Sequence, residues 1–218
     1  MSDTDSTFIV KNAWQTEQRD RILKPFFYDR YFPGKYRFLD SNNPSERYAD
    51  TLVQTSEGQL VIEEKIVHWP IDKLTKQPRD RAYTAFTLET WSNPECGRMG
   101  WMHTSTSDIL IYAFSIPKSE VGLDVYVMRM QALKKWFWSV GEEMWSITRT
   151  EEFNRTVCRV VPIADVTANV PTKRYMIGPG WHDSHFCVVC CAEAPWGFGV
   201  DGFRGNPGKY YCKEHKPQ

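Results

Sequence analysis

The first part of the chain carries apolar residues at the spacing of a helix. Within residues 13–31, Ile22, Phe26 and Phe27 form an apolar stripe among residues that favour helices. Pro25 lies inside this run, and its missing N–H and its ring disfavour a helix interior. We therefore predict a helix over residues 13–31 that stops or kinks near Pro25.

Beyond this helix, alternating or clustered apolar residues predict short β-strands. The turn at Glu57 and Gly58 joins two such runs, and glycine supplies the positive φ that a short hairpin loop needs. Residues 47–55 and 59–67 are therefore predicted to pair as a hairpin. The other predicted strands are residues 36–39, 85–91, 109–114, 125–130, 157–161 and 175–177, with 109–114 as a buried strand and the last two as edge strands.

Helices and strands are interleaved along the body of the chain. Residues 132–140 predict a second helix, and residues 70–81 predict a loop that leads into a short one. This alternation is typical of an α/β fold. A turn at residues 178–180 separates the body from a cysteine-rich tail, so two domains are predicted, residues 1–178 and residues 179–218.

The composition limits the location and the partners of the protein. Lys plus Arg and Asp plus Glu both number 27, which argues against a passive coat of nucleic acid but is compatible with an enzyme that has a local basic groove. No apolar run approaches the roughly 20 residues that span a bilayer, and the polar, acidic start is unlike a signal peptide. We therefore expect a cytoplasmic protein with no membrane partner.

Four residues near the C-terminus have the spacing of a zinc site. Two chelating pairs, Cys-x-x-Cys and Cys-x-x-His, are separated by 21 residues, which is enough for a small hairpin. In a reducing compartment, thiolates at this spacing are better explained by zinc than by disulfides. The predicted Zn²⁺ ligands are Cys187, Cys190, Cys212 and His215. Four ligands leave no open position, so we expect a structural site that stabilises the tail.

Neighbouring residues offer other ligands for the same ion. Cys191 would replace Cys190 in a shifted register, although the two-residue spacer favours Cys190. His182 and His185 precede the first pair and are further candidates. The loop between the pairs is rich in aromatic residues such as Trp196, so the module would either contact nucleic acid or fasten the C-terminus to the body.

The predicted hairpin brings charged residues together. Strand side chains alternate between faces, so Glu63 and Lys65 share one face, and the turn returns Asp50 beside one of them, about 5 Å away if directly opposite. Two carboxylates this close repel unless a cation lies between them, and oxygen ligands suit Mg²⁺ or Mn²⁺. A neighbouring lysine can orient or deprotonate a water, or neutralise charge on a phosphate. These groups are those needed for phosphodiester hydrolysis.

Three further carboxylates are candidates for supporting roles. Glu64 shares its strand face with apolar residues, and it would become the metal-facing carboxylate if a bulge shifted the register. Glu17 on the first helix and Glu89 on the strand at residues 85–91 are surface charges unless the fold brings them to the same patch.

Hydroxyl, basic and aromatic residues follow in the second half of the body. Residues 104–107 are all Ser or Thr, and they would either donate hydrogen bonds to a phosphate or cap the next element. Lys134 and Lys135 precede three aromatic residues at 136–138. Basic residues beside aromatic ones can hold phosphates and stack bases, although most such rings belong to a core and its rim.

The order of a helix, a hairpin with an aspartate and then Glu-x-Lys resembles the PD-(D/E)xK nuclease superfamily, which has the restriction-endonuclease-like fold. The later segments at residues 86–89, 100–101 and 107–110 are similar to phage-borne members. The resemblance covers residues 13–140, and no proline precedes Asp50, where the family pattern often has one. It implies a central mixed β-sheet flanked by helices.

The resemblance also implies a function and a site. By this resemblance the protein is expected to be a Mg²⁺- or Mn²⁺-dependent endonuclease acting on DNA. Asp50 and Glu63 would bind the metal, and Lys65 would assist the attacking water. For a phage-borne protein the location would be the cytoplasm of a bacterial host. Two other hypotheses stay open: a non-catalytic phage interaction or nucleic-acid-binding protein that keeps this fold, and an RNA-processing enzyme. Homodimerisation also stays open.

Overall fold

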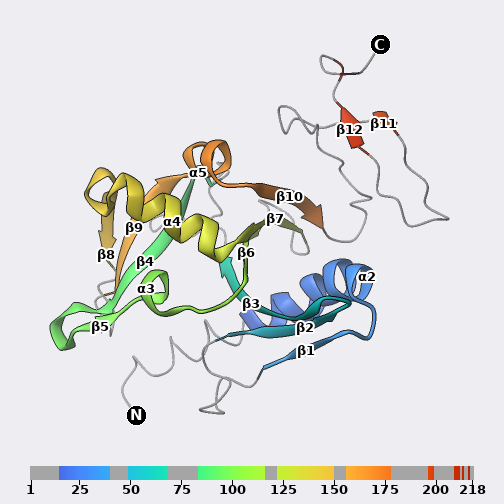
Figure 1. The fold of residues 1–218 in the computed structure, drawn as a ribbon, viewed down its shortest axis with the longest axis horizontal. Coiled ribbons are helices and arrows are strands. Elements are labelled where there is room, and N and C mark those ends of the chain that lie inside the picture. Colours follow the sequence, from blue (N-terminus) through green and yellow to red (C-terminus); the bar gives the residue numbers. More distant parts are fainter. Residues whose placement is uncertain are drawn as a thin grey trace, which may run out of the picture.

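The fold is seen in a computed structural model. It describes residues 15–39, 49–67, 83–115, 122–149, 156–177, 196–198 and 209–211, together with Lys213 and Lys216. The described residues form a six-stranded sheet, a four-stranded sheet and a separate two-stranded pair, with helices packed against the larger sheet (Figure 1). The predicted α/β class, with a mixed central sheet flanked by helices, is thereby confirmed.

The central sheet has the strand order β1-β2-β3-β6-β7-β10. β3 and β6 are parallel, and the other neighbouring pairs are antiparallel. The strand predicted from residue 47 begins only at Thr51 in the described part of the chain. The bounds are β1 Tyr36–Phe38, β2 Thr51–Thr55, β3 Gly58–Val67, β6 Ile109–Ser115, β7 Leu123–Arg129 and β10 Thr172–Ile177.

A second sheet has the order β5-β4-β9-β8, and all of its pairs are antiparallel. Its strands are β4 Ala85–Asn93, β5 Arg98–Met99, β8 Ser146–Arg149 and β9 Val157–Pro162. The prediction of an edge strand at residues 157–161 is wrong, because β9 pairs with β4 on one side and with β8 on the other. β10, predicted at residues 175–177, does lie at the end of the central sheet.

Short helices connect the strands. Between β5 and β6 the chain forms α3, Trp101–Thr104, and directly after β7 it forms α4, Met130–Val140. The other helical segments are residues 15–18, η1 Arg19–Tyr28, α2 Asp29–Tyr31, η2 Pro94–Cys96, η3 Glu142–Met144 and α5 Ile163–Asn169. Among the described helices, none combines the length and the apolar composition needed to cross a bilayer. The helix expected within residues 70–81 lies outside the described residues.

The first helix does not end at Pro25. The chain is helical from residue 15 to residue 31, and the stretch that contains Pro25 is a π-helix, in which Asp29 N–H donates to Lys24 O. A proline in an α-helix removes a hydrogen bond and crowds the carbonyl four residues earlier. We attribute the helix's continuation to the wider π-helical turn, which is a known form of local irregularity within helices.

The two faces of the central sheet bury different partners. Along β6 the side chains alternate, so that Leu110 and Tyr112 belong to one core cluster while Ile111 and Ala113 belong to the other. The cluster with Ile111 contains the buried face of η1, and the cluster with Tyr112 contains residues of β4, α3 and α4. Both faces of β6 are therefore covered by other parts of the protein.

Gly100 allows β4 and α3 to lie close together. A Cβ at this position would lie 2.4 Å from Glu89 O and 2.7 Å from Glu89 C, and these atoms belong to the backbone. We predict that Gly100→Ala lowers the free energy of unfolding by about 3 kcal/mol, the upper end for overpacking. Denaturant unfolding would measure this loss. Gly34→Ala is the control: its φ is +65° but its Cβ would meet nothing within 4 Å, so it should cost only about 1 kcal/mol.

Candidate functional site

Asp50 lies at the start of the β2–β3 hairpin, directly before Thr51. The paired register of the hairpin ends with Thr51 and Ile62. Asp50 N–H donates to Ile62 O at 2.9 Å, so the aspartate stays against β3 although it is outside the paired register. The Asp50 carboxylate raises the pKa of both Glu63 and Lys65, so it is near both of the neighbours that the sequence allowed.

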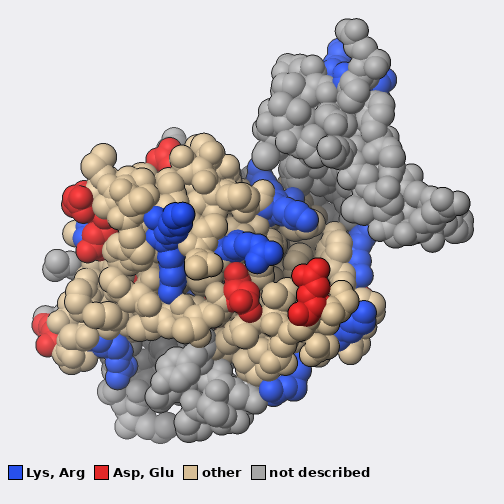
Figure 2. All heavy atoms as spheres, in the orientation of Figure 1, with Lys and Arg blue, Asp and Glu red and all other residues tan. Residues whose placement is uncertain are grey.

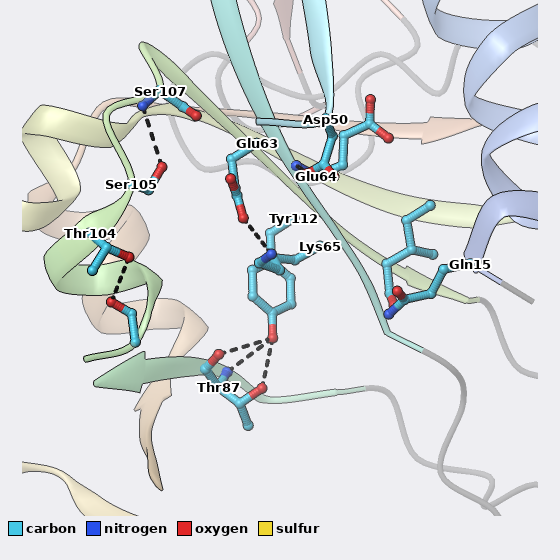
Figure 3. A network of polar contacts seen from close by, with 12 residues as sticks. Gln15, Asp50, Glu63, Glu64, Lys65, Thr87, Thr104, Ser105, Ser107 and Tyr112 are labelled. Carbon is cyan, nitrogen blue, oxygen red and sulfur yellow. Dashed lines mark hydrogen bonds and ion pairs between the residues drawn. The ribbon is translucent and has the colours of Figure 1, made fainter. Parts of the chain in front are cut away.

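Glu63 and Lys65 lie on one face of β3 and form an ion pair (Figure 3). The Glu63 side chain is 9% exposed and the Lys65 side chain is 32% exposed, so the pair lies at the rim of the core. The Lys65 ammonium lies 5.8 Å from the centre of the Trp101 ring on α3. The predicted alternation along this strand is therefore seen in the structure.

The charges of this cluster influence one another. Burial raises the pKa of Glu63; the Lys65 ammonium opposes this shift, and the Asp50 carboxylate adds to it. Burial lowers the pKa of Lys65, but the Glu63 and Asp50 carboxylates outweigh that effect and raise it above its ordinary value. Glu89 also raises the pKa of both groups. The Lys65 ammonium is therefore held in its charged form by the carboxylates around it.

Glu64 faces the other side of the sheet, toward η1. β3 pairs with β2 and β6 without a bulge, so the register shift that would turn Glu64 to the Glu63 face is not seen. The Glu64 carboxylate accepts hydrogen bonds from Tyr28 Oη and from Thr51 Oγ1, the latter at 2.6 Å. Burial raises the pKa of Glu64 to about 7, and the Asp50 carboxylate adds to the shift. Glu64 N–H donates to Asp50 Oδ2 at 2.6 Å, so its main chain positions the aspartate.

The hydrogen bond between Tyr28 and Glu64 should be a large contributor to stability. Both side chains are buried, and above about pH 7, where the Glu64 carboxylate is ionised, a hydrogen bond to this charged group is worth about 1.5–3 kcal/mol. We predict that Tyr28→Phe lowers the free energy of unfolding by that amount in denaturant titrations. Tyr36→Phe is the matched control, because Tyr36 Oη donates to Asp29 on the exposed side of the same helix and should matter much less. Equal losses in the two variants would contradict this assignment.

The two remaining candidates, Glu89 and Glu17, differ in their distance from the site. Glu89 on β4 is close enough to raise the pKa of both Glu63 and Lys65, so it belongs to the surroundings of the site. Glu17 is about half exposed and forms an ion pair with Arg21 at 2.8 Å along its own helix. This places Glu17 on the outer side of the helix rather than in the cluster.

Tyr112 was not singled out from the sequence, where it is one apolar position within a buried strand. It is paired with Lys65 across the parallel β3–β6 ladder. Its Oη bonds Thr87 Oγ1 at 2.8 Å and accepts from Thr87 N–H at 3.2 Å (Figure 3). The phenol therefore links the two sheets directly beside the Glu63–Lys65 pair.

The predicted zinc ligands lie outside the described residues, as do Cys191, His182 and His185. The structure does describe the segment between the two ligand pairs. There β11, Trp196–Phe198, pairs antiparallel with β12, Lys209–Tyr211. β12 ends directly before Cys212, so a small two-stranded element precedes the second ligand pair, as its length suggested.

Comparison with known proteins finds no family model, no curated protein and no solved structure that matches the chain. The structure itself defines a class: an α/β protein with a mixed central sheet, in which the β2–β3 hairpin carries two carboxylates and a lysine at the rim of the core.

Proposed function

We propose that this protein is a divalent-cation-dependent nuclease whose active site is formed by Asp50, Glu63 and Lys65. The observation that carries the proposal is their convergence: Glu63 is ion-paired with Lys65 on one face of β3, and the Asp50 carboxylate is close enough to raise the pKa of both. Two carboxylates and an ammonium at one rim supply oxygen ligands for a cation and a positive charge for a phosphate.

The donor set fits Mg²⁺ or Mn²⁺. Asp50 and Glu63 offer carboxylate oxygens, which these ions prefer, and Mg²⁺ commonly uses only one or two protein carboxylates and completes its shell with water and substrate oxygens. Within the described ranges, no group of three or more His, Cys, Asp or Glu side chains has the arrangement of a metal site, so the protein would contribute only two carboxylates to the ion. Asp50 and Glu63 would therefore hold the ion. When bound, it would polarise the phosphodiester and make a water more acidic.

The residues of the chain have separate tasks in this proposal. The Glu64 N–H holds Asp50 Oδ2, which fixes the direction of that carboxylate. The Lys65 ammonium, paired with Glu63, keeps its proton and so orients the attacking water or offsets charge on the phosphate, rather than removing a proton. The ring of Trp101, whose centre lies 5.8 Å from the Lys65 ammonium, would favour the charged form of the lysine through a cation–π contact.

The fold supports this proposal in outline. The chain forms a helix, then the antiparallel unit β1–β2–β3, and then β6 as a parallel neighbour of β3. The result is a mixed sheet flanked by helices, which is the architecture that the resemblance to the PD-(D/E)xK superfamily implies. We extend the proposal to the tail, where Cys187, Cys190, Cys212 and His215 would bind a structural Zn²⁺ through three thiolates and an imidazole, a donor set that zinc favours.

DNA is the proposed substrate, and the protein is proposed to act in the cytoplasm. Figure 2 shows acidic and basic side chains interspersed on the described part of one face, so contacts with a nucleic acid would be local rather than spread over a basic surface. The test is a panel of single- and double-stranded DNA and RNA, each incubated with Mg²⁺, Mn²⁺ or chelator. Metal-dependent cleavage of DNA supports the proposal, preferential cleavage of RNA supports an RNA-processing enzyme, and no cleavage of any substrate supports a non-catalytic binding protein.

A further inference from the structure

A second lysine approaches the site from α4. Lys134 Nζ donates hydrogen bonds to His103 O, at 3.4 Å, and to Ser105 O, both at the end of α3. Burial lowers the pKa of Lys134, and the Glu63 carboxylate opposes this shift. The Lys134 ammonium is therefore fixed by the main chain of one element while it lies within electrostatic reach of the proposed metal ligand.

A buried hydroxyl without a partner lies next to this lysine's anchor. Ser107 is 5% exposed, and its Oγ has no hydrogen-bond partner among the described residues. Its N–H donates to Ser105 Oγ at 3.3 Å, and Figure 3 shows the Ser107 side chain directed toward the side of the loop on which Glu63 lies. Buried polar groups nearly always have a partner, so such an exception points to a water or ligand that completes it.

The loop that carries this hydroxyl is fixed to the catalytic strand. Asp108 N–H donates to Val61 O at 2.8 Å, and Val61 N–H donates to Asp108 Oδ2 at 2.8 Å. Val61 is two residues before Glu63, on the same strand. The positions of the Ser107 hydroxyl and the Glu63 carboxylate are therefore coupled through a pair of hydrogen bonds.

We infer that Lys134 and the loop at residues 105–107 form the side of the site that receives a phosphate of the nucleic acid, an inference that rests on the proposed nuclease function. A lysine ammonium has three donors, and two of them are directed at carbonyl groups, so one is left for a phosphate oxygen. Ser107 Oγ is too deeply buried to touch a phosphodiester, and it donates instead through one ordered water. Lys134 thereby supplies a positive charge opposite the carboxylates of Asp50 and Glu63.

Adjacent lysines on α4 allow a matched test. Lys134→Met and Lys135→Met would be compared in a Lys65→Ala background with Mg²⁺, where the proposed chemistry is slowed and binding of labelled duplex DNA can be followed by fluorescence anisotropy. Lys134 is half-buried and Lys135 is exposed. Lys134→Met should weaken binding about tenfold and reduce the slope of log affinity against log salt by about 0.9, the value for one lost phosphate contact. Lys135→Met should change neither appreciably.

The outcomes separate this inference from the proposed function. Equal affinity and equal salt slope in the two variants would overturn the inference, even if the wild-type protein cleaves DNA. A loss confined to Lys134→Met would support it, even if the protein binds nucleic acid without cleaving it. Lys134→Arg guards against a folding defect, because it keeps a cation at the anchor and should retain most of the affinity and the salt slope.

A serine pair provides the second test. Ser107→Ala removes a hydroxyl that has no hydrogen-bond partner among the described residues, so it should leave the melting temperature unchanged or raise it, while weakening DNA binding about threefold. Ser105→Ala removes the acceptor of the Ser107 N–H and should lower the melting temperature instead. A Ser107→Ala protein that loses stability but keeps full affinity would show a structural role and contradict the inference.

Discussion

A Lys65→Ala variant is expected to lose Mg²⁺-dependent cleavage of DNA, with kcat lower by a factor of about 10²–10³, the usual cost of removing one group that stabilises the charge of a transition state. The physical reason is the ion pair that holds the Lys65 ammonium beside Glu63, where a metal ion and a phosphate would meet. Single-turnover cleavage of a labelled duplex, with enzyme in excess and with Mg²⁺ added to start the reaction, would measure the chemical step directly.

The interpretation needs a folded variant. Removing Lys65 leaves the carboxylate of Glu63 without its ion-pair partner at a site that is 9% exposed, so a lower melting temperature is expected in metal-free buffer. Added Mg²⁺ should restore part of that loss if Asp50 and Glu63 hold the ion. Lys135→Ala, an exposed lysine on α4, is the control for the loss of one positive charge. Wild-type cleavage rates in a folded Lys65→Ala protein would falsify the assignment of Lys65 to the active site.

Removal of zinc is expected to have the second large effect. The purified protein should contain about one zinc ion per chain, and Cys190→Ser should abolish zinc binding and unfold the tail, because structural zinc contributes roughly 10–16 kcal/mol of apparent binding free energy in small modules. Elemental analysis would give the zinc content, and limited proteolysis would report cleavage in residues 179–218 while the body stays intact.

Cys191 is the internal control for that experiment. It neighbours Cys190 in the sequence but has the wrong spacing for the first chelating pair, so Cys191→Ser should keep its zinc and its resistance to protease. If instead Cys191→Ser releases the ion and Cys190→Ser retains it, the shifted register is correct. Full zinc loading in both variants would point to His182 or His185 as the fourth ligand.

The local parts of the fold and of the site were predictable. The hairpin depends on a turn with glycine between two apolar runs, and it forms with the strands at the expected places. Alternation along β3 is enough to put Glu63 and Lys65 on one face, since the period of a strand does not depend on distant residues. The same alternation places Glu64 on the opposite face of β3, among apolar residues, where a free carboxylate is not expected.

The remaining parts depend on contacts between distant segments. Nothing near Glu64 in the sequence shows that Tyr28 will reach it from η1, and this contact is what satisfies the buried carboxylate. β9 became an inner strand because β8 pairs with it, and the four-residue β8 has a weak pattern of its own. Lys134 was visible only as a charge beside aromatic residues, because its approach to the site depends on how α4 packs against α3.

Glu63 and Glu64 are adjacent on β3 and point to opposite faces of the sheet. β3 could therefore pair with its neighbouring strands in two alignments that differ by one residue. If β3 slipped by one residue against its neighbours, Glu64 would enter the polar rim, while Glu63 and Lys65 would turn toward the apolar residues of η1. A chain that paired in this way would still form a hairpin, so it would be a trap on the folding pathway. The Asp50 carboxylate binds the Glu64 N–H only in the native alignment, and the same aspartate proposed to hold the metal thereby helps the newly folded strand choose its register.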